Sequence, residues 1–217
     1  METNQYVIID LEMCKVPSSV KKDLYPCRNE IIEIGAVKVN EKLEITDSFK
    51  TYVSPEFGAL DDYIHNLTGI NDSDLENAPK LQEAIDSLIK WLPENPVFVS
   101  WSDTDSYQMS REMYYKYIDI PEFDKYFKEW EDCQEIFSEK MNSPKVYKLS
   151  DALIIAGLDY NENIHDALVD AQNTALLFIK LKTESTLQLS PYYSTESNSG
   201  TLTFKPFANL LLNHKHI

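Results

Sequence analysis

The sequence predicts an α/β protein built on a mixed, five-stranded sheet flanked by helices. Three consecutive segments, residues 6–12, 31–39 and 43–53, have the β-branched, apolar character of strands. After them, apolar residues recur at helical spacing, and strand-like segments alternate with these helices. An antiparallel meander followed by alternating helices and strands is typical of an α/β fold with a mixed sheet.

The first predicted strand, residues 6–12, is apolar on both faces up to its acidic residues, which is typical of a buried central strand. A polar loop then leads to the second strand, and residues 40–42 are expected to form the hairpin turn before the third strand. Pro55 is expected to end that strand, because proline cannot donate to a sheet hydrogen-bond ladder.

Helices and two more strands are expected in the rest of the folded region. In chain order they are a helix over 60–67, an amphipathic helix over 81–92, a strand over 97–101, a helix from 102 toward 117, a short strand near 129–133 with a helix in 123–141, and helices over 149–156 and 167–181.

The composition changes after residue 183. Residues 184–203 are rich in Ser and Thr, with Pro191 and Gly200, and show no helical periodicity. We therefore expect a folded domain over residues 1–183 and a tail over 184–217. The tail ends in an apolar segment, 204–212, which is expected either to dock on the domain or to meet a protein partner.

The chain is strongly acidic, with 36 Asp and Glu against 20 Lys and Arg and a net charge of -16. This charge disfavours a protein that grips nucleic acid nonspecifically through a basic face. It does not exclude an enzyme that holds phosphates through bound cations, because such cations are large local charges outside the residue count.

Three cysteines without a CxxC pair argue against a disulfide framework and against a zinc knuckle. No apolar stretch approaches the length of a membrane span, so we expect no membrane association. A reducing, cytoplasmic location fits these features best.

Two acidic residues, Asp10 and Glu12, stand two apart at the end of the first predicted strand. Side chains at that spacing point to one face of a strand, and two crowded carboxylates repel each other unless a cation lies between them. Mg²⁺ or Mn²⁺ would suit such a site, since both prefer oxygen ligands. Taken alone, the pair is better explained by a strand end that reaches solvent.

Two further segments carry residues of the same chemistry. His165 is expected at or just before the start of the last helix, with Asp170 one turn along it, and small alanines would let that helix lie close to the sheet. Asp103 and Asp105 follow the predicted strand 97–101, at a strand-to-helix junction where α/β folds place ligands. Either of the two could be the third acid, which would leave the other as a helix N-cap.

Together, Asp10-x-Glu12, the junction aspartate and His165-x-Ala-x-x-Asp170 resemble the motifs of the DEDDh 3′-to-5′ exonucleases, in order along residues 5–182. Ile31–Val37 and Leu67–Ile70 resemble further signatures of that family. The sequence around the first acids is most similar to the branch that contains bacterial sporulation-inhibitor-like exonucleases and eukaryotic histone-mRNA 3′ exonucleases.

The resemblance implies a ribonuclease-H-like fold and hydrolysis with two Mg²⁺ or Mn²⁺ ions. Asp10, Glu12 and Asp170 would hold the ion that activates water. Asp10 and Asp105 would hold the second ion at the leaving 3′ oxygen. His165 would be the general base, a role that histidine often fills near neutral pH.

Two residues outside the acidic set are candidates for substrate binding. Met13, next to Glu12, is a candidate for contact with the terminal nucleoside, although a core methionine is the more ordinary explanation. Lys148, just before the final helices, is expected to contact phosphate, unless it is simply a solvated lysine.

The function that follows is metal-dependent removal of 5′-mononucleotides from the 3′ ends of single-stranded RNA or DNA, with RNA favoured. One alternative is a regulatory protein-binding module that retains the exonuclease fold. Another is a phosphodiesterase for very short oligonucleotides, which would suit an acidic surface because such a substrate needs no long basic groove.

Overall fold

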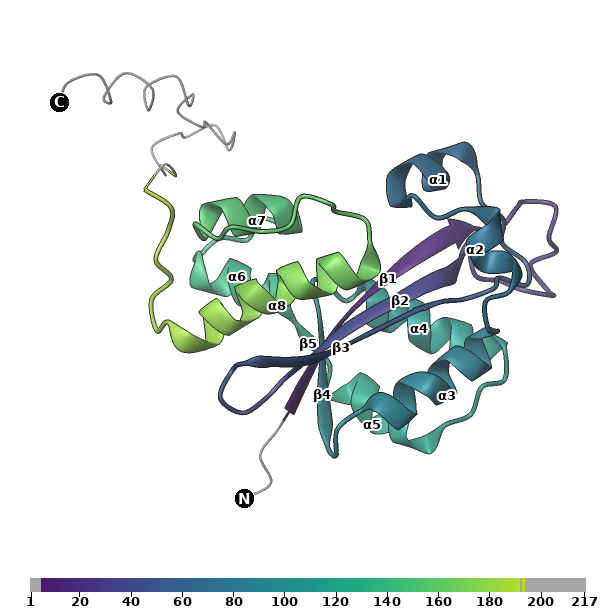
Figure 1. Ribbon diagram of the computed structural model, residues 1–217, viewed down its shortest axis with the longest axis horizontal. Coiled ribbons are helices and arrows are strands. Elements are labelled where there is room, and N and C mark those ends of the chain that lie inside the picture. Colours follow the sequence, from purple (N-terminus) through teal and green to yellow (C-terminus); the bar gives the residue numbers. More distant parts are fainter. Residues whose placement is uncertain (1–4, 192, 194–217) are drawn as a thin grey trace.

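The computed structural model describes residues 5–191 and 193 of the 217-residue chain. Its centre is one sheet in the order β3-β2-β1-β4-β5 (Figure 1). Its strands are β1 (Gln5–Lys15), β2 (Asn29–Val39), β3 (Ile45–Tyr52), β4 (Pro96–Ser100) and β5 (Glu131–Asp132). The first three pair antiparallel, whereas β4 lies parallel to β1 and β5 parallel to β4. The predicted meander and mixed sheet are confirmed.

The helices of the described residues follow the predicted order, with two that the sequence did not predict: the short α2 and one more after residue 120. The helices are α1 (Asp62–Thr68), α2 (Asp72–Glu76), α3 (Leu81–Trp91), α4 (Thr104–Tyr115), α5 (Pro121–Lys128), α6 (Cys133–Lys140), α7 (Leu149–Ile155) and α8 (Ala167–Thr183). The sequence predicted one helix beside the strand near residue 130. The structure has α5 before β5 and α6 after it, because Pro121 suits the first turn of a helix and Asp132 caps the next one.

Each face of the sheet carries its own hydrophobic core. Helices α3, α4 and α5 cover one face, and α6, α7 and α8 cover the other (Figure 1). Val7, Ile9 and Leu11 of β1 belong to the first core, while Ile8 belongs to the second. Side chains alternate along a strand, so Asp10 and Glu12 face the side on which α8 lies. No helix in residues 5–191 is both long enough and apolar enough to cross a membrane.

The chain stays packed for some residues beyond α8. Leu187 is buried in the second core, and the backbone N–H of Ser190 donates to the carbonyl of Ile155 at 2.7 Å. Lys140 also donates to the carbonyl of Ser185 at 3.2 Å. The domain limit at residue 183 stays a prediction, and the apolar segment 204–212 lies outside the described residues.

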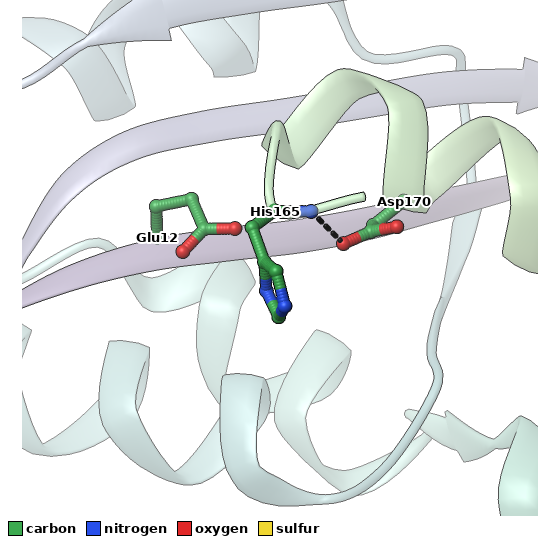
Figure 2. Close-up of side chains that lie close together, drawn as sticks. All are labelled: Glu12, His165 and Asp170. Carbon is green, nitrogen blue, oxygen red and sulfur yellow. Dashed lines mark hydrogen bonds between the residues drawn. The ribbon is translucent and has the colours of Figure 1, made fainter. Parts of the chain in front are cut away.

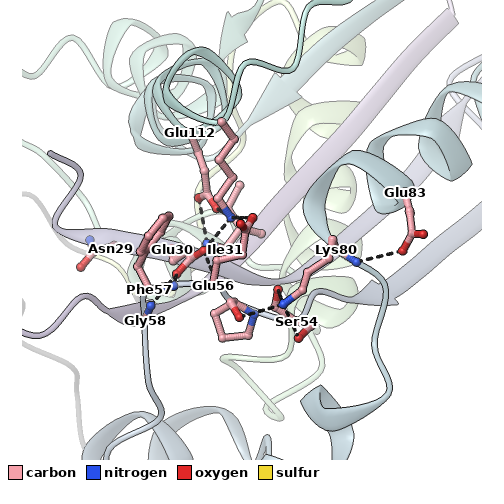
Figure 3. Close-up of polar contacts among 12 residues, drawn as sticks. Asn29, Glu30, Ile31, Ser54, Glu56, Phe57, Gly58, Lys80, Glu83 and Glu112 are labelled. Carbon is pink, nitrogen blue, oxygen red and sulfur yellow. Dashed lines mark hydrogen bonds and ion pairs between the residues drawn. The ribbon is translucent and has the colours of Figure 1, made fainter. Parts of the chain in front are cut away.

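A buried ionic network fastens α4 to the sheet and to the segment after β3. The Lys116 ammonium lies 2.6 Å from the Glu30 carboxylate and 3.0 Å from that of Glu112. Glu30 also accepts hydrogen bonds from the backbone N–H groups of residues 56–58, as Figure 3 shows for Phe57 and Gly58. Glu112 accepts one from the Ile31 N–H at 2.9 Å. The network therefore fastens the C-terminal end of α4 to β2 and to the segment after β3.

Replacing Lys116 by Met should destabilise the protein by about 3–5 kcal/mol, because it leaves two fully buried carboxylates without their cation. Urea unfolding of the variant and the wild type measures the difference. Lys125→Met is the matched control, since Lys125 is exposed and lies 3.8 Å from its partner Glu129. Equal losses in the two variants would contradict this account of the network.

Candidate active site

The first part of the site is the C-terminal half of β1. Asp10 lies opposite Gly35 of β2, and Glu12 lies opposite Glu33. The pairing of β1 with β2 shifts its register between Glu12 and Met13. Such an irregularity bends a strand and redirects its side chains, and it is frequent beside functional sites. As predicted, both acids share the face toward α8.

The second part is the N-terminus of α4. Asp105 is 7% exposed, and its carboxylate accepts a hydrogen bond from the Leu11 N–H at 3.2 Å. This bond joins α4 to the one residue that lies between the two β1 acids. Asp103 occupies the N-cap position, but it is exposed and its side chain makes no capping hydrogen bond. Asp103 therefore occupies the expected N-cap position, but its side chain does not make the hydrogen bond that an N-cap residue usually makes.

The third part is the segment that enters α8. Asp166 caps the helix by accepting from the N–H groups of Leu168 and Val169 at 3.1 and 3.2 Å. His165 precedes it with a φ of 69°, a left-handed conformation that is uncommon for a residue other than glycine. Its backbone N–H donates to the Asp170 carboxylate at 2.9 Å. The strained backbone therefore ties the histidine to the acid one turn further on.

These segments meet in one cluster. Glu12, His165 and Asp170 each offer a ligand atom, and these atoms all lie within 4.8 Å of one another. Figure 2 shows the imidazole of His165 between the carboxylate of Glu12 and that of Asp170. The helix can come this close because Gly35 lacks a side chain. A Cβ there would lie 2.2 Å from the backbone of Ala167.

Burial and mutual repulsion dominate the electrostatics of the cluster. Burial, followed by the charges of Asp105 and Asp170, raises the pKa of Asp10 well above its usual value. Burial and the neighbouring acids raise the pKa of Glu12 to about 8. Burial also raises the pKa of Asp105 to about 7, against the hydrogen bond from Leu11. Each acid thus resists ionisation beside the others.

The donor set fits a hard divalent cation. Its carboxylate oxygens are suitable ligands for Mg²⁺ or Mn²⁺, and the imidazole of His165 lies within 4.8 Å of the ligand atoms of Glu12 and Asp170. Oδ1 of Asp170 is buried and has no hydrogen-bond partner within the described residues. A cation would satisfy this oxygen and offset the repulsion that raises the pKa values of the acids.

A supporting ion-pair group lies beside the cluster, and no sequence pattern predicted it. Lys50 of β3 lies 2.6 Å from Glu33 and 2.6 Å from Asp166. Glu33 is 1% exposed and also accepts from the Ala167 N–H at 3.1 Å. The group therefore clamps the start of α8 onto β2 and β3. Only Glu33 had a sequence signal, because it lies in the motif Ile31–Val37.

The two candidate substrate-binding residues lie apart from this cluster. Met13 is half-buried and packs against the first core. Lys148 is exposed at the N-cap position of α7. Within the part of the chain that the structure describes, no hydrogen bond or ion pair links Lys148 to the acids, so both roles stay predictions.

Comparisons with known proteins agree with this arrangement. The exonuclease family model RNase_T matches residues 7–178. The chain is 29% identical over 206 residues to ERI1 exoribonuclease 2 of Danio rerio, covering 82% of this chain and 35% of that protein. It is 26% identical over 166 residues to 3′-5′ exoribonuclease 1 of Rattus norvegicus, covering 70% of this chain and 47% of that protein.

A solved structure has the same architecture. The nuclease domain of 3′hExo, a DEDDh family member bound to rAMP, is similar with a TM-score of 0.72 and 24% identity, covering 87% of this chain and 97% of that one. The fold is thus that of the ribonuclease-H-like nucleases. The chain belongs to the exonuclease family described by RNase_T. It spans about half or less of the length of the two curated relatives named above.

The crowded acids predict how stability depends on pH when no metal is bound. The usual pKa of Glu12 is 4.5, and in the folded protein it is about 8. The folded state therefore holds a proton that the unfolded chain releases between these values, so the free energy of unfolding falls as pH rises through this interval. Thermal unfolding in EDTA between pH 5 and 8 should show a falling midpoint.

Glu12→Gln is the matched variant, because it keeps the size of the side chain and removes its charge. Its unfolding midpoint in EDTA should depend less steeply on pH than that of the wild type, and it should exceed the wild-type value at pH 8. A wild-type midpoint that rises from pH 5 to 8 would contradict the repulsion described here.

Proposed function

We propose that this protein is a metal-dependent 3′-to-5′ exoribonuclease that releases 5′-mononucleotides from single-stranded RNA. The observation that carries the proposal is the cluster of Glu12, His165 and Asp170, which joins cation ligands to a proton acceptor. The names of the relatives support RNA as substrate, since both are called exoribonucleases. The nuclease domain of 3′hExo binds rAMP, a ribonucleotide of the kind that such a reaction releases.

Four acids are proposed to hold the cations. Asp10, Glu12 and Asp170 would share one ion, and Asp10 with Asp105 the other. When bound, two divalent ions stabilise the charges on the attacking and leaving oxygens of a phosphodiester. The buried and hydrogen-bonded position of Asp105, against the exposed position of Asp103, supports Asp105 as the third acid.

His165 is proposed to accept the proton of the attacking water. A bond forms between the water oxygen and the terminal phosphorus, and the bond from that phosphorus to the 3′ oxygen of the preceding nucleotide breaks. The products are a 5′-mononucleotide and an RNA one residue shorter with a new 3′ hydroxyl. The left-handed backbone at His165 and its N–H bond to Asp170 support this role, because they hold the imidazole beside the acids.

Incubation with 5′-labelled single-stranded RNA tests the proposal. With Mg²⁺ or Mn²⁺ the RNA should shorten from its 3′ end, and EDTA should stop the reaction. His165→Ala should lower turnover by about 10²–10⁴-fold, the usual contribution of a general base. The same sequence as DNA, run in parallel, should be degraded more slowly than the RNA.

His65→Ala is the matched control for the histidine substitution. His65 is exposed on α1, and its ring contacts the carbonyl of Ile70 at 2.9 Å; within the described residues it makes no hydrogen bond or ion pair with the four acids. Turnover of this variant should equal that of the wild type. Full activity in EDTA, or an undiminished rate in His165→Ala, would overturn the proposed mechanism.

A further inference from the structure

The exposed side of α4 carries an arginine between two tyrosine rings. The Arg111 guanidinium lies 5.2 Å from the ring centre of Tyr107 and 5.6 Å from that of Tyr115, and it donates to the Tyr107 hydroxyl at 2.5 Å. These residues are spaced four apart, so they form one stripe along the helix. The stripe begins two residues after Asp105. A rise of about 1.5 Å per residue places Arg111 roughly 9 Å along the helix axis from that acid.

A basic loop lies beside this stripe. The segment between β1 and β2, residues 16–28, holds three cations, Lys21, Lys22 and Arg28, against the single acid Asp23. All three cations are exposed. Among the described residues, no carboxylate lies within ion-pair distance of them or of Arg111. The loop therefore carries a local excess of positive charge in a chain whose net charge is -16.

The loop and the helix enclose a common groove. Gln108 of α4 donates to the carbonyl of Asn29 at 3.0 Å, which holds the end of the loop against the helix. Further along, the groove has a volume of about 700 Å³, and its lining includes Lys22, Tyr114 and Tyr117 beside the acids Asp23, Asp119 and Asp124. Tyr114 is 74% exposed and Tyr117 is 93% exposed. In Figure 1, α4 runs from the sheet toward this loop.

This combination has the chemistry of a single-strand binding surface. Aromatic faces stack on bases of any sequence, and cations alongside them follow the phosphates. Arginine suits such a place because its planar guanidinium both stacks and binds phosphate. A protein partner would also contact exposed tyrosines, but the excess of cations on the loop beside them favours a strand of phosphates.

We propose that the stripe of α4 and the basic loop bind the nucleotides that precede the 3′-terminal residue of a single-stranded RNA. Arg111 contacts a phosphate, while Tyr107 and Tyr114 stack on bases. Lys21 and Lys22 hold the strand further from the acids. The inference rests on the proposed exonuclease function and extends it, since it makes the enzyme prefer long single strands over dinucleotides.

Kinetics on two substrate lengths test the surface. Arg111→Gln should raise KM for a 20-nucleotide single-stranded RNA by about 10-fold and leave turnover of a ribodinucleotide unchanged. The slope of log affinity against log salt should fall by about 0.7 for each phosphate that the variant no longer neutralises. The double variant Lys21→Gln, Lys22→Gln should act in the same direction. Both lysines are exposed, so we expect the double variant to fold. It therefore tests the surface even if Arg111→Gln fails to fold.

Lys42→Gln is the matched control, because Lys42 is an exposed cation in the turn between β2 and β3. Its KM on the long RNA should equal the wild-type value. The wild type could cleave both RNAs while the loop and Arg111 variants show the wild-type KM on the long RNA. The proposed binding surface would then be wrong, and the proposed exonuclease function would be retained. If the wild type cleaves neither RNA, the proposed function fails and the inference fails with it.

Discussion

Repulsion among buried carboxylates at the end of β1 is the constraint on which the rest of the structure depends. Asp10 feels the charges of Asp105, Asp170 and Glu12 at once, in addition to its own burial. Holding these acids close together lowers the stability of the folded protein unless a cation is bound between them. The local devices around them are what hold the acids in place: the hydrogen bond from Leu11, the left-handed backbone before α8, and a glycine where that helix touches the sheet.

Two ion-pair networks, one around Lys116 and one around Lys50, support the acids from opposite faces of the sheet. On one face, the buried pair of Lys116 and Glu30 sets the position of α4, which delivers Asp105. On the other, Lys50 joins β2 and β3 to the start of α8. Because each network uses a cation to neutralise carboxylates of its own, neither leaves a cation free to neutralise the central acids. The site is therefore preorganised for a ligand of positive charge.

The sequence was sufficient where the relevant pattern is local. The period of a strand put Asp10 and Glu12 on one face, and the spacing of His165 and Asp170 put both at one helix start. It was insufficient where contacts join distant segments: Lys50 and Asp166 are 116 residues apart, and no periodicity connects them. The basic loop and its groove could not be predicted from the net charge either, because net charge does not report where charges lie. Only the fold brings Lys22 and the tyrosines of α4 to one groove. The extra helix near residue 130 escaped because α5 and α6 are only eight residues each.

A calorimetric titration with Mn²⁺ at pH 8 tests most directly whether the acids are held together to bind cations. The account predicts two ions bound per chain of wild-type protein, and loss of at least one of them in Glu12→Gln and in Asp170→Asn. It also predicts unchanged binding in Glu56→Gln, which alters a partly exposed acid of the distant Lys116 network. Absence of binding by the wild type, or equal binding by Glu12→Gln, would contradict the account.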